Sequence, residues 1–233
     1  RYGGYPDAME EAWKLFRKTA YSSLYSYPRF TWQTVIPDQR RISKIDLSDD
    51  YLQAIRLYAS CADELKSSEL YRNDLIEFVS YYVAAKAENF YKQALKDDSE
   101  NRVLAAQRNL QQTVDLLMDV DRLLASHPLY RLEEWVELAR NSGTTLQEKD
   151  AYEANAKRLI TSWGGIQEDY AARFWSGLIK DYYIPRIQLY FTKDRDKIRE
   201  WEEQWITSPW SNSTTPFDDP VKAALNLIEK TNK

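Results

Sequence analysis

The residues of this chain that could do chemistry are mostly carboxylates and aromatic rings. Among 233 residues there is one cysteine, Cys61, and one histidine, His127. A nucleophile activated by a base needs an imidazole or an equivalent group beside a serine or cysteine. However, His127 precedes Pro128 at a predicted helix end, and Cys61 lies on the apolar side of another predicted helix. We interpret His127 as a helix C-terminal residue and Cys61 as a small buried hydrophobe.

The acidic residues do not form an obvious catalytic pair. Glu133 and Glu134 are adjacent in the sequence, as are Glu202 and Glu203. Neighbouring residues diverge around a helix, so we interpret both pairs as parts of solvated helix faces. The sequence also contains no phosphate-binding glycine loop and no cluster with metal-ligand spacing. We therefore predict no catalytic residue, no metal and no cofactor within this chain.

Composition excludes several classes of partner and fold. The chain carries 32 basic and 36 acidic residues, a net charge of −4, which argues against nucleic acid as a partner. It has no run of 18 apolar residues, so we expect no membrane span. Only six residues are glycine, and none lies between Tyr5 and Ser142. This scarcity disfavours turn-rich β folds and nucleotide-binding folds with glycine loops.

The elements that position these residues are expected to be helices. No proline falls between Asp38 and His127, so long helices fit there. Apolar spacing predicts helices over about 7–26, from Ser48, over 68–98, 99–127, 129–140, 145–163 and 166–191, the last kinked at Pro185, and near 221–230. Helix starts are expected at capping boxes that begin with Asp7 and Thr145 and at the capping residues Ser48 and Ser99. The helices over 68–98 and 99–127 are expected to form an antiparallel hairpin, and 27–47 a long connection. The sequence thus predicts an all-α bundle of about seven to nine helices, including long antiparallel ones, within one domain over 1–233.

Aromatic residues supply the strongest functional signal. The chain has 32 of them, and the segment from Tyr152 to Arg186 places Trp163 and Tyr170 on either side of Gly164-Gly165. A flat ring can cover the apolar face of a pyranose while its hydroxyl or indole N–H finds a polar partner. In that case the glycine break opens the floor of a cleft. Alternatively, the glycines end a helix and the rings fill the core at helical spacing.

Three motifs carry a resemblance to a known family. They are Y-E-x-N-A-K-x-L-I-T-x-W-G over 152–164, D-Y-A-x-R-x-W-x-G-L over 169–178 and D-Y-Y-x-P-R over 181–186. In order and spacing this segment resembles the C-terminal helical domain of the α-N-acetylglucosaminidases, glycoside hydrolase family 89. Further blocks upstream extend the resemblance over about 1–192, whereas the tail over 193–233 matches weakly.

The resemblance implies a function for the aromatic segment. In that family the two catalytic glutamates belong to a preceding (β/α)8 barrel, so neither lies in this chain. The helical domain closes one side of the sugar pocket, and the family's pocket Trp and Tyr match Trp163 and Tyr170. The linker between these motifs is shorter here, which leaves Ile166 or Gln167 for a third, apolar position. The implied substrate is a glycan ending in α-linked N-acetylglucosamine, cleaved with retention by an exo-acting enzyme.

The same resemblance implies the setting of the domain. We expect a fragment of a longer enzyme whose partner is an upstream barrel of the same chain, exported if bacterial and lysosomal if animal. One alternative is a non-catalytic helical module that docks on another domain or binds glycans. A second alternative, a self-sufficient hydrolase, is disfavoured because the sequence offers no convergent acid pair.

Overall fold

The predicted all-α class is confirmed. A computed structural model describes residues 2–22, 30–34, 48–163 and 169–232. Within these residues there are ten α-helices, which occupy more than half of the positions, and no β-strand. The count exceeds the expected seven to nine because of a four-residue helix, α3 (Ala62–Leu65), and an unexpected helix near the C-terminus, α9 (Arg195–Thr207).

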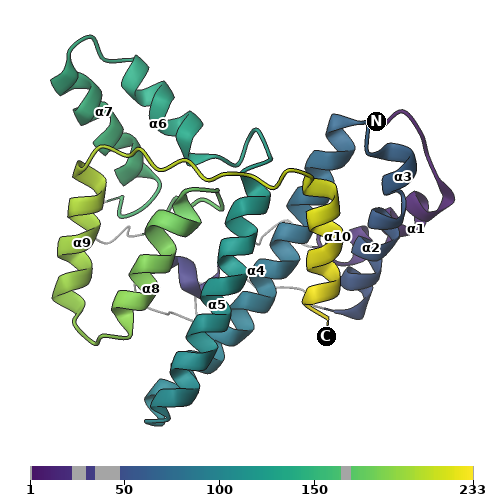
Figure 1. Cartoon of the computed structure of the whole chain (residues 1–233), viewed down its shortest axis with the longest axis horizontal. Coiled ribbons are helices and arrows are strands. Elements are labelled where there is room, and N and C mark those ends of the chain that lie inside the picture. Colours follow the sequence, from purple (N-terminus) through teal and green to yellow (C-terminus); the bar gives the residue numbers. More distant parts are fainter. Residues whose placement is uncertain (1, 23–29, 35–47, 164–168, 233) are drawn as a thin grey trace.

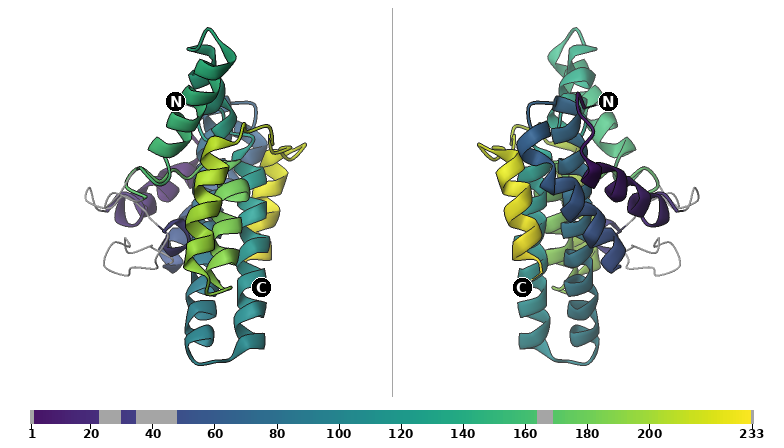
Figure 2. Two further views of the ribbon diagram at one scale, coloured as in Figure 1. Left: turned by 90° about the vertical axis from the view of Figure 1, so that its left-hand side faces the viewer. Right: turned by 90° about the vertical axis from the view of Figure 1, so that its right-hand side faces the viewer.

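A long helical hairpin forms the centre of the molecule. It consists of α4 (Glu69–Ser99) and α5 (Val103–Leu124), which run antiparallel as predicted and project beyond the other helices at their shared tip (Figures 1 and 2). Ser68 begins α4 as expected, because its hydroxyl accepts the Tyr71 N–H. Ser99 does not cap α5, however: it ends α4 and donates its hydroxyl to the Lys96 carbonyl at 2.7 Å. The chain reverses at Asn101, which has a φ of 59°.

The other helices lie on two sides of this hairpin (Figure 1). One side carries α1 (Asp7–Lys18), α2 (Asp49–Ser60), α3 and α10 (Pro220–Lys230). The other side carries α6 (Leu132–Asn141), α7 (Leu146–Leu159), α8 (Ile184–Tyr190) and α9. A 3-10 turn over Thr31–Gln33 packs on α4, and most of the expected connection over 27–47 lies outside the described residues.

The helix starts test the capping predictions. Ser48 caps α2, and Thr145 with Glu148 forms the expected reciprocal capping box of α7. The expected box at Asp7 is wrong: Pro6 occupies the N-cap position and makes no side-chain cap, so Asp7 is the first helical residue. Helix α1 also ends at Lys18, well before the expected end near residue 26.

The helix expected over 166–191 is also wrong in its first half. Residues 169–177 are irregular, with left-handed backbone at Asp169 (φ 59°) and Gly177 (φ 82°). Regular structure starts with a π-helical turn over Ile179–Tyr183, which leads directly into α8. Pro185 lies at the start of α8, and proline cannot continue an α-helical hydrogen-bond ladder. The expected kink therefore takes the form of this wide π-helical turn.

Aromatic side chains fill much of the core. Phe16 of α1 stacks on Phe78 of α4 with ring centroids 4.1 Å apart. Tyr58 stacks on Tyr71 at 4.9 Å, and the Tyr71 hydroxyl donates to the Tyr58 carbonyl at 2.8 Å. Burial of such rings with their hydroxyls satisfied explains most of the aromatic content without a ligand.

Candidate functional site: an exposed aromatic pair over a buried ion network

The structure brings Trp163 and Tyr170 together. Their ring centroids lie 5.6 Å apart at an interplanar angle of 63°, an edge-to-face contact. Trp163 is 36% exposed and Tyr170 is 63% exposed. All eight tryptophans lie in the described residues, and the side chain of Trp163 is more exposed than those of the other seven. The pair is therefore a surface feature, in contrast to the many rings that fill the core.

The backbone on either side of this pair is pinned. Trp163 follows the end of α7 in a left-handed conformation (φ 51°), and its N–H donates to the Arg158 carbonyl at 2.8 Å. Asp169, which precedes Tyr170, donates its N–H to the Thr161 carbonyl at 3.0 Å. This bond closes the loop that carries both rings. Gly164, Gly165, Ile166 and Gln167 lie outside the described residues, so the expected third pocket position is not described.

A buried arginine binds the residue that precedes Tyr170. Arg186 of α8 is 2% exposed, and its Nη1 lies 2.8 Å from the Asp169 carboxylate and 2.9 Å from that of Glu202 on α9. Its Nη2 donates to the Gln33 carbonyl at 2.7 Å, and the Tyr182 hydroxyl donates to Glu202 at 2.7 Å. Charges of both signs thus meet where four segments of the chain converge.

The electrostatics of this network keep the arginine charged. Burial by itself lowers the pKa of Arg186, but the negative charges of Asp169 and Glu202 raise it well above the ordinary value. Burial also raises the pKa of the Tyr182 hydroxyl, so this group stays a neutral donor. The interpretation of Glu202 as a solvated residue is therefore wrong: it is 6% exposed and binds Arg186.

This convergence of two carboxylates does not make a catalytic acid pair. Asp169 and Glu202 both bind the same guanidinium nitrogen, and both are buried. A glycosidase needs one carboxyl group to give a proton and the other to attack or to activate water at the sugar. Because both carboxylates are buried against the same arginine, neither is accessible to a sugar, so we assign them a structural role.

A second buried cluster ties the C-terminal tail to α7. Lys157 is 1% exposed, lies 3.1 Å from Glu153 and donates to the carbonyls of Trp205 at 2.9 Å and Ser208 at 2.5 Å. Glu153 also accepts the Trp210 backbone N–H at 2.5 Å. Burial lowers the pKa of Lys157. Both charged residues belong to the motif over 152–164, so the motif holds the tail as well as leading to Trp163.

A third buried acid, Asp121 of α5, anchors the segment that follows Tyr170. Its Oδ1 accepts the backbone N–H groups of Gly177 at 2.8 Å and Lys180 at 3.1 Å. Its Oδ2 accepts the Thr214 hydroxyl at 2.6 Å. Burial raises the pKa of the Asp121 carboxyl.

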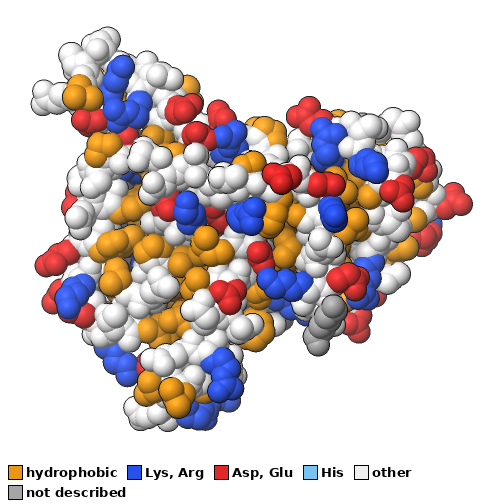
Figure 3. All heavy atoms as spheres, viewed as in Figure 1, with side chains coloured by type: hydrophobic (Ala, Val, Ile, Leu, Met, Phe, Trp, Pro, Cys, Tyr) orange, Lys and Arg blue, Asp and Glu red, His pale blue; other side chains and the backbone are white. Residues whose placement is uncertain are grey.

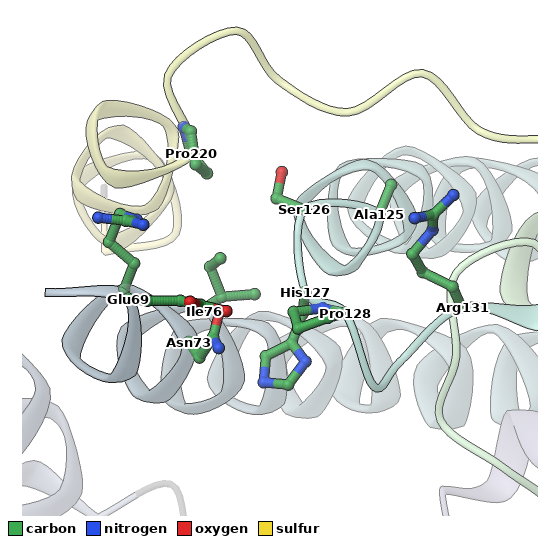
Figure 4. Close-up of a pocket in the computed structure, with 10 residues that line it drawn as sticks. Glu69, Asn73, Ile76, Ala125, Ser126, His127, Pro128, Arg131 and Pro220 are labelled. Atoms are coloured by element: carbon green, nitrogen blue, oxygen red, sulfur yellow. The ribbon is translucent and has the colours of Figure 1, made fainter. Parts of the chain in front are cut away.

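His127 and Cys61 are not part of a nucleophilic site. His127 lines a cavity of about 290 Å³ between α4, the end of α5 and the start of α10, far along the sequence from the aromatic pair (Figure 4). Its Nδ1 accepts the Leu129 N–H at 3.1 Å, and burial lowers its pKa. Neighbouring Ser126 has a buried hydroxyl that bonds to no described residue. Cys61 is 3% exposed and donates to the Leu57 carbonyl, which confirms the prediction of a buried thiol.

Within the described part of the chain, no group of three or more His, Cys, Asp or Glu side chains is arranged to hold a metal ion. No helix in the described ranges is long and apolar enough to cross a membrane.

The surface near α8 and α9 is rich in apolar side chains. Figure 3 shows them gathered between these helices and α5, below the extended tail, with charged residues around the margins. A domain that packs on another one must expose apolar side chains where the two meet, and this face does so. That an upstream barrel covers such a face stays a prediction.

Sequence reasoning found the two rings but missed the residues that hold them. Asp169 and Arg186 were visible as members of motifs, yet nothing in their spacing indicated that they pair. Glu202 carried no signal except its position midway between Ile198 and Ile206, which are 2% and 1% exposed. An apolar stripe with one central acid on a helix indicates a buried ion pair, and this was the available clue.

Comparisons with known proteins place this geometry in a family. The sequence profile described as "Alpha-N-acetylglucosaminidase (NAGLU) C-terminal domain" matches residues 1–230, which includes most of the tail. The human protein named α-N-acetylglucosaminidase is 28% identical over 216 residues, which is 86% of this chain and 28% of the human sequence.

Solved structures share the fold. A family 89 glycoside hydrolase from Clostridium perfringens in complex with PUGNAc aligns with a TM-score of 0.84 at 22% identity, over 98% of this chain and 30% of the bacterial one. Another structure from this organism, with two Glu→Gln substitutions and described as in complex with its substrate GlcNAc-α-1,4-galactose, aligns with a TM-score of 0.83 at 21% identity, over the same shares. The chain thus spans less than a third of the length of these relatives.

Proposed function

Because this chain belongs to the family of α-N-acetylglucosaminidase C-terminal domains, we propose that it closes one side of the sugar pocket of an exo-acting, retaining α-N-acetylglucosaminidase. The observation that carries the proposal is the aromatic pair. Trp163 and Tyr170 are exposed, touch each other and sit on a pinned backbone, at the positions that the family motifs assign to the pocket.

The pair suits a pyranose for a physical reason. A sugar ring presents axial C–H groups on its faces and hydroxyls at its edge, so a flat ring covers the face while water or polar groups satisfy the edge. Two rings in edge-to-face contact form a corner, which can cover a face and one side of a terminal sugar. Such a wall excludes water from the scissile bond, which strengthens the electrostatic interactions of catalytic carboxylates.

The acid chemistry belongs elsewhere in our proposal. Retaining hydrolysis needs a nucleophilic carboxylate and an acid/base carboxyl about 5 Å apart. The buried carboxylates beneath the pair, Asp169 and Glu202, are both bound to Arg186. We place the two catalytic glutamates on an upstream (β/α)8 barrel of the same parent protein, which the resemblance implies.

The substrate that we propose is a glycan with a terminal α-linked N-acetylglucosamine. Support comes from the substrate printed for the Clostridium perfringens structure, GlcNAc-α-1,4-galactose, and from the name of the human relative. Because free polysaccharides lie outside the cytoplasm, we propose export for a bacterial source and a lysosomal location for an animal one. No cofactor and no metal enter this mechanism.

We further propose that 1–233 form one domain that includes the tail over 193–233. The buried contacts of Lys157 with the carbonyls of Trp205 and Ser208 support this, since they join the tail to α7 by charged hydrogen bonds. The family match, which continues to residue 230, supports it as well.

The experiment that tests the proposal compares the chain with its full-length parent. We expect the parent to hydrolyse an aryl α-N-acetylglucosaminide and the 233-residue chain alone to hydrolyse none, because it lacks both catalytic carboxylates. Turnover by the purified chain, abolished by substitution of one of its own acids, would contradict the proposal. A parent without this activity would favour the alternative, a non-catalytic docking or glycan-binding module.

A further inference from the structure

The network around Arg186 is more polar than stability alone requires. One guanidinium and two carboxylates are buried here, with exposed fractions of 2%, 3% and 6% for Arg186, Asp169 and Glu202. Desolvation of such charges offsets most of their attraction, so apolar residues of similar size often stabilise a core equally well. The network therefore calls for a second explanation, and its contacts supply one.

Each contact of Arg186 fixes a different segment near the aromatic pair. Through Asp169 it holds the loop that carries Tyr170, and through Glu202 it holds α9. Its bond to the Gln33 carbonyl holds the segment over 30–34. The guanidinium is planar with donors in a fixed fork, so it fixes direction as well as distance.

The residue next to Tyr170 needs this support. Asp169 has a left-handed backbone (φ 59°), which residues other than glycine adopt infrequently and which the surrounding structure must hold in place. Its N–H bond to the Thr161 carbonyl and its carboxylate bond to Arg186 hold it in that conformation. Without the second bond, Asp169 can turn outward to water, and Tyr170 turns with it because the two residues share a peptide unit.

We propose that Arg186 is a positioning residue: by binding the Asp169 carboxylate it fixes the Tyr170 ring against Trp163 and so sets the shape of the aromatic wall. It does not touch the sugar, since only 2% of its surface is exposed. This inference rests on the proposed function for its effect on activity, but the geometric part is independent of it.

The geometric part can be tested in the 233-residue chain labelled with 5-fluorotryptophan. The ¹⁹F resonance of Trp163, identified by its loss in Trp163→Phe, reports the nearby Tyr170 ring. Tyr170→Ala gives the shift expected when that ring is gone. We expect Asp169→Asn to move the resonance toward the Tyr170→Ala position, because asparagine tolerates the left-handed backbone but removes the charge that binds Arg186.

A matched control separates positioning from loss of stability. Asp97 is 3% exposed, lies near the tip of the α4–α5 hairpin and binds Arg102, so Asp97→Asn makes the same change to a distant buried carboxylate. We expect it to leave the Trp163 resonance in place. Arg186→Met, which removes the charge, is expected to move the Trp163 resonance toward the Tyr170→Ala position. Arg186→Lys, which keeps the charge, is expected to leave the resonance between that of Arg186→Met and that of the wild type. An unmoved Trp163 resonance in folded Asp169→Asn and Arg186→Met chains would overturn the inference.

Activity provides the second readout, as a double-mutant cycle in the full-length parent. We expect Arg186→Lys to lower kcat/KM about fivefold to tenfold in the wild-type background but less than about twofold in the Tyr170→Ala background, since a residue that acts through another is not additive with it. Additive losses would reject positioning through Tyr170. If Tyr170→Ala and Trp163→Ala leave kcat/KM unchanged, the proposed sugar wall fails, whereas the ¹⁹F result still decides the role of Arg186.

Discussion

Replacing Lys157 by methionine tests whether the motif over 152–164 holds the C-terminal tail. The substitution keeps most of the apolar stem and removes only the ammonium group. Lys157 is 1% exposed and donates to the carbonyls of Trp205 and Ser208, at the C-terminal end of α9, while it lies 3.1 Å from Glu153. The ammonium therefore caps one helix and neutralises a buried acid at the same time.

The contacts set the expected size of the effect. Breaking a buried ion pair from one side costs about 3 to 5 kcal/mol, because the remaining charge stays buried. Glu153 keeps two other partners, the Arg140 guanidinium at 2.6 Å and the Trp210 N–H at 2.5 Å. The loss is therefore expected at the lower end, about 3 kcal/mol in the free energy of unfolding.

Urea unfolding of the 233-residue chain measures the loss in the free energy of unfolding of Lys157→Met, and Arg158→Met serves as the control. Arg158 forms a bidentate ion pair with Glu203, with N···O distances of 2.7 and 2.9 Å, and this pair also joins α7 to α9. Unlike Lys157, its side chains are exposed, Arg158 by 36% and Glu203 by 57%. Exposed pairs contribute about 0 to 1 kcal/mol. Equal losses in the two variants, or a loss below about 1 kcal/mol for Lys157→Met, would refute the reasoning.

Two further predictions concern the segment after Tyr170. Gly177→Ala is expected to lower the free energy of unfolding, measured in urea, by about 2 to 3 kcal/mol. The reason is that Gly177 has a φ of 82° and an added Cβ would lie 3.1 Å from side-chain atoms of Leu132 and Trp210. An unchanged midpoint of urea unfolding would contradict this. Asp121→Asn tests the buried acid: its pKa is raised in the fold, so the native state holds the proton more tightly than the unfolded state between pH 3.8 and the raised value. Across that window the wild type loses stability as the pH rises, so its melting temperature relative to that of Asp121→Asn is expected to fall from about pH 4 toward neutrality. A wild-type melting temperature that rises relative to that of the variant over this range would refute the assignment.

Local signals predicted much of the fold. The caps at Ser48, Ser68 and Thr145 and the proline-free stretch up to His127 located α2, α4, α5 and α7, because they depend on interactions within a few residues. Ser99 misled the prediction because its hydroxyl bonds backward to the Lys96 carbonyl, which a serine near a helix end can do equally well.

The remaining errors depend on contacts between distant segments. Tyr170 and Phe174 are spaced like one face of a helix, but residues 169–177 are irregular, and Phe174 packs on the distant Phe30 and Trp32. Helix α9 escaped detection because its buried stripe contains Glu202, whose partner Arg186 lies on another helix. In neither case does the local sequence identify the distant partner.

Whether Trp163 belongs to a sugar pocket or to the core is the central question for this chain. The decisive measurement is kcat/KM together with the melting temperature of Trp163→Ala in the full-length parent, beside Trp32→Ala, in which a ring with 0% exposure is removed. The account predicts that Trp163→Ala lowers kcat/KM about tenfold to a hundredfold, or about 1.4 to 2.7 kcal/mol, with a smaller loss of stability than the roughly 3 to 5 kcal/mol of a core tryptophan. A Trp163→Ala protein that unfolds as readily as Trp32→Ala, yet keeps normal kcat/KM in its folded fraction, would contradict the account.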